Sequence, residues 1–169
     1  MRAVIRRGPQ LVVDTAPDPT PGPGQVLVKT LACGICGGDL HALQHMDQLI
    51  ASHKRARFPD MPPPPMVADR DMVFGHEFCS EIVDFGPDCQ KLFSPGARVS
   101  SVPFLLGGPN GYELVGYSNR YPGGFGEYMV LSERTLLPVP NGLSADHAAL
   151  TEPFSVGTHA VARAHPTMD

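Results

Sequence analysis

Three short segments of this 169-residue chain carry side chains of the types that bind metal ions. In chain order they are Cys36-Gly37-Gly38-Asp39-Leu40-His41, Gly75-His76-Glu77 and Glu152-Pro153. Catalytic zinc sites take about three protein ligands of thiolate, imidazole or carboxylate type and leave one position open for water or substrate. Cys36 and His76, joined by Glu77 or Glu152, would supply such a set. A zinc ion held in this way is a Lewis acid that lowers the pKa of a bound hydroxyl by several units.

The elements that would hold these side chains are predicted to be mainly short β-strands. The chain contains 18 glycines and 19 prolines, which favours strands joined by many turns. Gly8-Pro9 is a plausible hairpin turn between the first two strands. Strand patterns cover residues 3–5, 10–13, 25–31, 78–85, 98–102, 127–131 and 136–139.

Two regions are predicted to be helical. The glycine-rich segment that begins at Cys33 opens a short helix that runs toward His45. Near the other end of the chain, Ser144 is a good N-cap for a second helical region. Because proline lacks an amide donor and clashes with the preceding turn, this region is expected to break at Glu152-Pro153 and to resume over residues 155–164.

Residues 47–72 are predicted to form a long surface loop. The tetrad Pro62-Pro63-Pro64-Pro65 can form neither a helix nor a strand ladder. A loop of this length is either a lid over a functional site or a simple mobile insertion, and both interpretations remain open. A second glycine-rich loop is expected between Gly107 and Gly124.

Composition and charge exclude several classes of partner. The formal net charge is −4 and no basic stripe is present, so we expect no nucleic-acid partner. We expect no membrane partner, because no run approaches the ~20 apolar residues of a spanning helix. The first residues lack the apolar core of a signal peptide, which indicates a cytoplasmic protein with reduced cysteines.

Each metal-binding segment alone is weak evidence, but together and in this order they resemble the zinc-dependent medium-chain alcohol and polyol dehydrogenases. The matching pieces are residues 33–41, 75–77, Pro95-Gly96-Ala97-Arg98-Val99, Gly123-Gly124-Phe125-Gly126-Glu127-Tyr128 and residues 152–160. The resemblance implies a mainly β fold, a GroES-like, partly open β-barrel with short C-terminal helices. It also implies one zinc- and substrate-binding domain over residues 1–169, in which residues 144–169 form the helical segment that leads to a nucleotide-binding domain.

The resemblance assigns metal ligands residue by residue. Cys36 and His76 would bind zinc. Glu77 would be a further ligand, or the carboxylate that exchanges with water as substrate arrives. Glu152 stands where the polyol-dehydrogenase branch keeps a glutamate that binds the metal directly or through water. The alternative for Glu152 is a plain carboxylate near a helix end.

Two catalytic residues also follow from the resemblance. Asp39 would orient the imidazole of His76, as a carboxylate behind a metal ligand commonly does. His41 would be a proton-relay histidine. The chain departs from the family at Gly38, where a serine or threonine commonly passes the substrate proton toward solvent. Without that hydroxyl, water or His41 alone would carry the proton, or alcohol oxidation would be impaired.

The cysteine pattern predicts one zinc ion and not two. Residues 99–124 contain no cysteine, whereas many family members carry a four-cysteine structural zinc lobe in this region. The segment Cys33-Gly34-Ile35-Cys36 could instead be a redox pair, but such a pair needs a βαβ context. A four-cysteine site would need a second close pair, and Cys79 and Cys89 are too far apart in sequence. Cys33, Cys79 and Cys89 are therefore expected to be small apolar residues in or near the core.

The predicted function is that of a catalytic-domain fragment of an oxidoreductase. In the intact protein, zinc would polarise an alcohol for hydride transfer to NAD or NADP. The sequence has no dinucleotide fingerprint, so the cofactor is expected to be held by a domain that this chain lacks, and the chain alone is expected to be inactive. The substrate would be a small alcohol, polyol or sugar, and the protein could form a homo-oligomer. The alternative is a stand-alone zinc or small-ligand binding module without redox activity.

Overall fold

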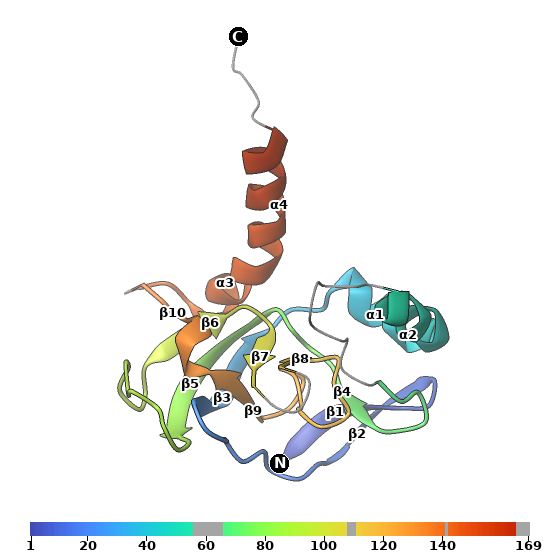
Figure 1. Cartoon of the computed structure of the whole chain (residues 1–169), viewed down its shortest axis with the longest axis horizontal. Helices are drawn as coiled ribbons and strands as arrows, with labels where there is room; N and C mark the ends of the chain where they lie inside the picture. The colour runs from blue at the N-terminus through green and yellow to red at the C-terminus, as the bar shows by residue number, and fades with distance from the viewer. Residues whose placement is uncertain (56–65, 108–110, 141, 165–169) are drawn as a thin grey trace.

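The structure, a computed structural model, describes residues 1–55, 66–107, 111–140 and 142–164. Figure 1 shows a body of strands with two short helices at one side and a further helix that projects away from it. The strands are β1 (Arg2–Arg7), β2 (Gln10–Thr15), β3 (Gln25–Cys33), β4 (Met72–Val73), β5 (Phe78–Phe85), β6 (Arg98–Ser101), β7 (Phe104–Leu106), β8 (Tyr112–Leu114), β9 (Tyr128–Ser132) and β10 (Leu136–Pro138). The helices are α1 (Gly37–Gln44), α2 (Met46–Arg55), α3 (Ala145–Ala149), α4 (Thr151–Ala164) and the 3₁₀ turn η1 (Glu133–Thr135).

The largest sheet is built around β3 and β5. Its strand order is β10-β6-β5-β3-β9, and its pairings are antiparallel. Val28 of β3 lies opposite Ile82 of β5 and Met129 of β9, and all three side chains are buried. Burying a side chain of this size contributes roughly 1.5–3 kcal/mol, which fixes the register because a slip by one residue would turn it to solvent. The register with β5 shifts between Thr30 and Ala32, just before the chain reaches the first candidate ligand.

Two smaller sheets complete the strand layer. The first has the order β2-β1-β4, and Ile5 of β1 pairs with Val73 of β4. An isolated bridge between Ala3 and Gly126 ties this sheet to the segment before β9. The second is the hairpin of β7 and β8. The sheets do not close on one another, which confirms the expectation of a mainly β, open architecture with short helices.

The prediction of a loop over residues 47–72 is wrong for the first part of this segment. Residues up to Arg55 belong to α2, whose half-buried Leu49 and Ile50 pack with Met46 against the cluster around Phe74. Met46, Leu49 and Ile50 have the spacing of three and four residues that is typical of one helix face. Because this pattern is short and is set among charged residues, the helix was not predicted. The proline tetrad lies outside the described residues.

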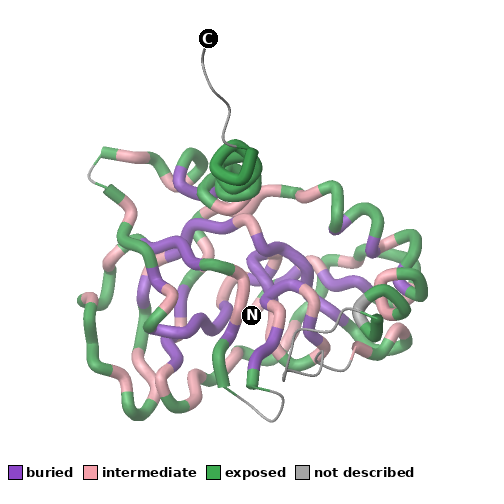
Figure 2. The backbone as a smooth tube through the Cα atoms, turned by 45° about the horizontal axis from the view of Figure 1, so that its top comes forward, coloured by how far each residue is buried: buried purple, intermediate pink, exposed green. Residues whose placement is uncertain are grey.

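The C-terminal helices are present, but their boundary differs from the expectation. Ser144 caps α3 as predicted, since its side chain accepts the N–H of His147. The break falls at Leu150, and Pro153 lies inside the first turn of α4. Proline is tolerated there because the first amides of a helix have no intrahelical acceptor. α4 contains no buried residue, and Figure 2 shows most of it as exposed; Glu152 and Pro153 in its first turn are half-buried.

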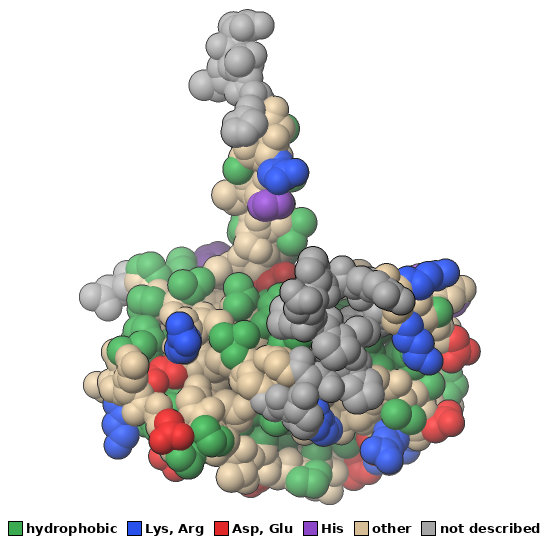
Figure 3. Space-filling view, in the orientation of Figure 1, with side chains coloured by type: hydrophobic (Ala, Val, Ile, Leu, Met, Phe, Trp, Pro, Cys, Tyr) green, Lys and Arg blue, Asp and Glu red, His purple; other side chains and the backbone are tan. Residues whose placement is uncertain are grey.

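The surface carries no large block of one charge on the face that Figure 3 shows. Blue and red side chains are interspersed over the strand body, and green apolar side chains occur along the projecting helix. Among the described residues, no helix has the length and apolar character that crossing a bilayer requires.

Candidate metal centre

Cys36 is held by the start of α1. It is the N-cap residue of this helix, and its Sγ accepts a hydrogen bond from the N–H of Gly38 at 3.4 Å. Asp39 accepts the N–H of Cys36 through Oδ2 at 3.1 Å, which completes a capping box. The capping arrangement therefore fixes the thiol and the carboxylate relative to each other. Sulfur is a weaker acceptor than the oxygen of the usual capping residues, which favours a role for this thiol beyond capping.

His76 and Glu77 lie between β4 and β5, in a segment that is held from two sides. The N–H of Gly34 donates to the carbonyl oxygen of Glu77 at 2.7 Å. The N–H of Gly124 donates to the carbonyl oxygen of Gly75 at 2.8 Å. Gly75 has a φ of +99°, a conformation that side chains rarely adopt, so glycine is required here. These contacts bring the two side chains to the segment that precedes α1.

The candidate ligands converge on one point. One potential ligand atom from each of Cys36, His76 and Glu77 lies within 4.8 Å of the other two. Within the described ranges, this is the one group of three or more His, Cys, Asp or Glu side chains with such spacing. His76 is buried, whereas Cys36 and Glu77 are half-buried, so the cluster is open to solvent on one side.

The polar atoms behind the cluster fit a metal-binding imidazole. Asp39 Oδ1 and His76 Nδ1 are both buried without a hydrogen-bond partner, and they face each other at 3.4 Å. Buried polar atoms are normally paired, so this contact is the natural partner for each of them. It leaves Nε2 of His76 as the ring nitrogen for a metal ion. Thiolate, imidazole and carboxylate donors, with a second carboxylate behind the imidazole, match the zinc sites of proteins.

The electrostatics of the cluster also favour a cation. Burial opposes protonation of His76, but the carboxylates of Asp39, Glu152 and Glu77 outweigh it and raise the pKa of the imidazole. Burial is the main cause that raises the pKa of the Cys36 thiol, and the charge of Glu77 adds to it. A divalent cation stabilises the deprotonated forms of thiol and imidazole and offsets the negative charge around them.

Besides Asp39, which lies behind His76, two further predicted site residues lie outside this three-residue cluster. Glu152 is half-buried in the first turn of α4, close enough for its charge to act on His76. His41 is exposed on α1, where its ring lies against that of His45 with 5.0 Å between centroids. The structure therefore groups Cys36 with His76 and Glu77, whereas Glu152 and His41 lie outside this group.

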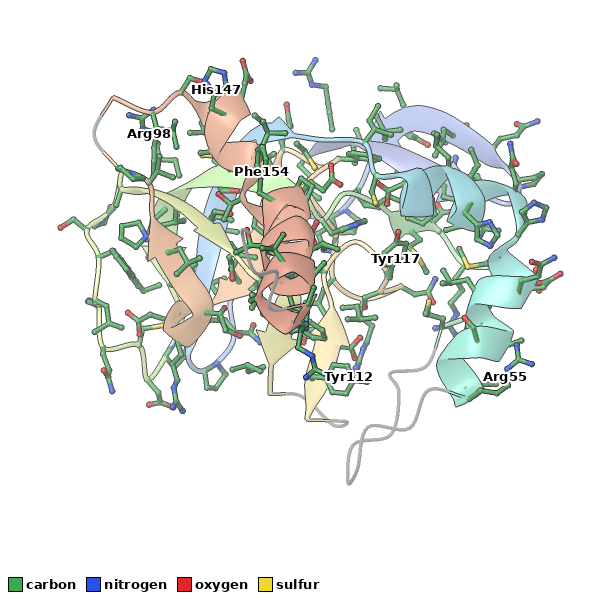
Figure 4. The ribbon with its side chains drawn as sticks, turned by 90° about the horizontal axis from the view of Figure 1, so that it is seen from above. Arg55, Arg98, Tyr112, Tyr117, His147 and Phe154 are labelled. Carbon is green, nitrogen blue, oxygen red and sulfur yellow. The ribbon has the colours of Figure 1, made fainter. Side chains whose placement is uncertain are left out.

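Tyr117 also belongs to the site, although the sequence did not single it out. It lies between β8 and β9, and Figure 4 shows it in the space between α4 and the α1–α2 pair as seen from above. Its ring centroid is 5.1 Å from that of His76 and 5.8 Å from that of Phe74. Burial raises the pKa of the phenol, and so do the charge of the Asp39 carboxylate and the approach of the hydroxyl to it. Its loop has neither periodicity nor a metal-binding motif, so no sequence signal marks this residue.

A cavity of about 410 Å³ lies apart from the cluster. It is bordered by the N-terminus, residues 15–20, residues 71–73 and residues 118–122. None of the three clustered side chains lines it. Cavity shape alone would therefore not have located the candidate metal centre.

Comparison with known proteins gives consistent matches along the chain. Residues 22–141 match the family described as the alcohol dehydrogenase GroES-like domain. The chain is 30% identical to sorbitol dehydrogenase of Bacillus subtilis, over 95% of this chain and 44% of that protein. It is 29% identical to L-threonine 3-dehydrogenase of Rhizobium rhizogenes, over 94% of this chain and 45% of that protein. The chain thus spans less than half the length of these curated relatives.

Solved structures agree with the sequence matches. The 2R,3R-butanediol dehydrogenase of Bacillus subtilis superposes with a TM-score of 0.71 at 28% identity, over 95% of this chain and 46% of that one. A protein of Sinorhizobium meliloti, assigned as a zinc-binding dehydrogenase and solved with NADP bound, gives a TM-score of 0.70 at 29% identity. That match covers 95% of this chain and 44% of the other.

Proposed function

Because the chain belongs to the family of alcohol dehydrogenase GroES-like domains, we propose that it is the metal- and substrate-binding part of a zinc-dependent dehydrogenase. Membership in this family also confirms the GroES-like fold expected from the sequence. The observation that carries the proposal is the convergence of Cys36, His76 and Glu77 from two distant segments. This set contains the three donor types that catalytic zinc sites use.

One zinc ion would be held by the Cys36 thiolate, the His76 imidazole and the Glu77 carboxylate. Glu77 is proposed as the third ligand because its carboxylate lies in the three-residue cluster, whereas Glu152 lies outside it. Glu152 would act on the ion through its charge or through a water molecule. Its charge already raises the pKa of His76 in the absence of a metal.

The protein's own side chains would hold this centre in place. Asp39 would accept the Nδ1 proton of His76, which fixes the tautomer that presents Nε2. The capping contact between Asp39 and Cys36 would keep the thiolate beside the imidazole. Zinc bound there would supply Lewis-acid chemistry toward a substrate oxygen.

A nicotinamide cofactor is assigned to no residue of this chain. The strand pairings among the described residues are antiparallel, whereas dinucleotide-binding folds are built on parallel βαβ units. The described residues therefore contain no parallel βαβ unit of the kind on which dinucleotide-binding folds are built. Only the metal centre and the substrate side of the reaction are proposed for them.

The proposed substrates are small alcohols, polyols or sugars. The relatives named sorbitol dehydrogenase, L-threonine 3-dehydrogenase and (R,R)-butanediol dehydrogenase support this class, since each name denotes a compound with a secondary alcohol. The proton-relay role of His41 stays a prediction. Its exposed position on α1 would suit a residue that passes protons to solvent.

Metal content of the purified chain tests the proposal. After zinc is offered at neutral pH and excess is removed, we expect about one ion per chain in the wild type. Cys36→Ser and His76→Ala should each lose it, because each removes one of about three protein ligands. Glu77→Gln should weaken zinc binding more than Glu152→Gln, because Glu77 lies in the cluster.

Two matched variants separate ligand loss from general damage. Cys89→Ser removes another half-buried thiol, whose hydrogen bond to the carbonyl of Gln25 a serine can also make. His159→Ala removes an exposed histidine on α4. Both should keep the wild-type zinc content. A wild-type chain without zinc, or full zinc content in Cys36→Ser and His76→Ala, would contradict the proposed function.

A further inference from the structure

The space above Gly38 is occupied by the hydroxyl of another residue. A Cβ atom added at Gly38 would lie 2.9 Å from Tyr117 Oη and 3.5 Å from Cys36 Sγ. Real Cβ atoms essentially never approach another heavy atom to less than 3.0 Å. Glycine at position 38 therefore makes room for the phenol, and the phenol oxygen shares this space with a candidate metal ligand.

The ring of Tyr117 has little freedom to move away. It packs against two rings, those of His76 and Phe74. Phe74 is buried in the cluster that also contains Ala42, Met46 and Met72. The aromatic contacts therefore hold the Tyr117 hydroxyl beside the metal-binding cluster, next to Cys36 and above Gly38.

We infer that the Tyr117 hydroxyl takes the place of a side-chain hydroxyl at position 38 and donates a hydrogen bond to the oxygen of a ligand bound at the Cys36–His76–Glu77 cluster. This inference rests on the proposed function. A phenol is protonated at neutral pH, so it can donate without any change of charge. The sequence departure at Gly38 is then compensated by a hydroxyl from a distant loop.

Among the residues that the structure describes, two other candidate donors are less well placed. His41 is exposed and lies against His45. The hydroxyl of Ser118, next to Tyr117 in the chain, donates to Glu113 in a buried contact. The candidate donor beside the cluster is therefore the phenol.

The test measures how a simple alcohol binds to the Co²⁺-loaded chain. Co²⁺ replaces zinc and gives an absorption spectrum that changes when an oxygen ligand binds, so no turnover is needed. The probe is 2,2,2-trifluoroethanol. Tyr117→Phe keeps the ring but removes the donor, and we expect it to bind the probe about five- to tenfold more weakly while its Co²⁺ content stays unchanged. Tyr121→Phe removes a phenol hydroxyl from the same loop and should bind the probe as the wild type does.

Two variants at position 38 test whether the hydroxyls are interchangeable. Gly38→Ala should displace the phenol and weaken probe binding to a similar extent, and adding Tyr117→Phe should cause little further loss because both changes remove one interaction. Gly38→Ser combined with Tyr117→Phe should restore binding to within about twofold of the wild type, since a serine hydroxyl then enters the vacated space.

The outcomes separate this inference from the proposed function. A wild-type chain that takes up no Co²⁺ overturns both. If Tyr117→Phe keeps its Co²⁺ and binds the probe like the wild type, only the role of Tyr117 is overturned. The same holds if Tyr117→Phe binds Co²⁺ more weakly or melts earlier but, once saturated with Co²⁺, binds the probe as the wild type does, because the phenol would then only support Asp39 and His76. Failure of the serine swap to restore binding also contradicts the exchange of hydroxyls.

Discussion

At the scale of single residues, Asp39 connects the two halves of the proposed metal centre. One carboxylate oxygen accepts the backbone N–H of Cys36, and the other faces Nδ1 of His76. The side chain is buried, so water does not replace either contact easily. Asp39 therefore couples the start of α1 to the imidazole that it orients.

Asp39→Asn should weaken zinc binding about tenfold to a hundredfold, as expected when the carboxylate behind a metal-binding imidazole is removed. The amide oxygen can still accept the N–H of Cys36, so the capping contact and the fold should persist. A competition titration with a chromophoric chelator measures the affinity. Asp47→Asn, an exposed change in the first turn of α2, is the matched control. An affinity within about threefold of the wild type would show that Asp39 does not support the metal centre.

Residue types, their order and the family resemblance predicted Cys36 and His76 as neighbours, with Glu77 or Glu152 beside them. The structure groups Glu77 with the first two. The sequence could not have predicted Tyr117. Its contact with His76 depends on where the loop between β8 and β9 crosses the sheet, and no local pattern encodes that path. Gly38 was a visible departure, but only the structure shows which side chain occupies the space above it.

At the scale of elements, the metal-binding segment before β5 is positioned by glycines on a neighbouring loop, the one between β8 and β9. A Cβ atom at Gly123 would meet the carbonyl oxygen of Gly75 and would lie 2.6 Å from both Gly116 Cα and the carbonyl oxygen of Phe74. These atoms are backbone and cannot move aside cheaply. Close backbone packing of this kind holds the segment of His76 against the sheet.

Gly123→Ala should lower the free energy of unfolding by about 1–3 kcal/mol, because the added methyl group forces backbone atoms apart. It should also reduce zinc affinity, since the segment that shifts carries two ligands. Gly157→Ala on exposed α4 meets no atom within 4 Å and should be neutral or slightly stabilising. Urea unfolding monitored by fluorescence or circular dichroism measures the free energy of unfolding of both variants. Equal stability of the two variants would contradict this account of how the segment is held.

Element types were predictable where the apolar pattern was long. β3 and β5 lie over nearly the expected residues. Their apolar residues alternate or form continuous runs, and such patterns predict a strand directly. α2 was missed since its few apolar residues are set among charged ones, and tertiary contacts with Phe74 select the helix. The helix break near Glu152 was placed two residues late, because proline fits within a first turn.

At the scale of the whole molecule, the chain forms one strand body and a helix that projects from it (Figure 1). Large apolar side chains are exposed on this helix, including Phe154, Val156 and Val161. An isolated helix of this length is marginal in water, so its stability depends on what it packs against. The metal centre lies in the strand body and near the first turn of α4, so it does not depend on the far end of the helix.

The measurement that tests the central claim most directly is X-ray absorption at the zinc edge of the zinc-loaded chain. The account predicts one sulfur neighbour at about 2.3 Å from Cys36, together with nitrogen and oxygen neighbours at about 2.0–2.2 Å from His76, Glu77 and an exogenous ligand. The sulfur neighbour should vanish in Cys36→Ser. A shell without sulfur, or one with several sulfur atoms, would contradict the proposed metal centre.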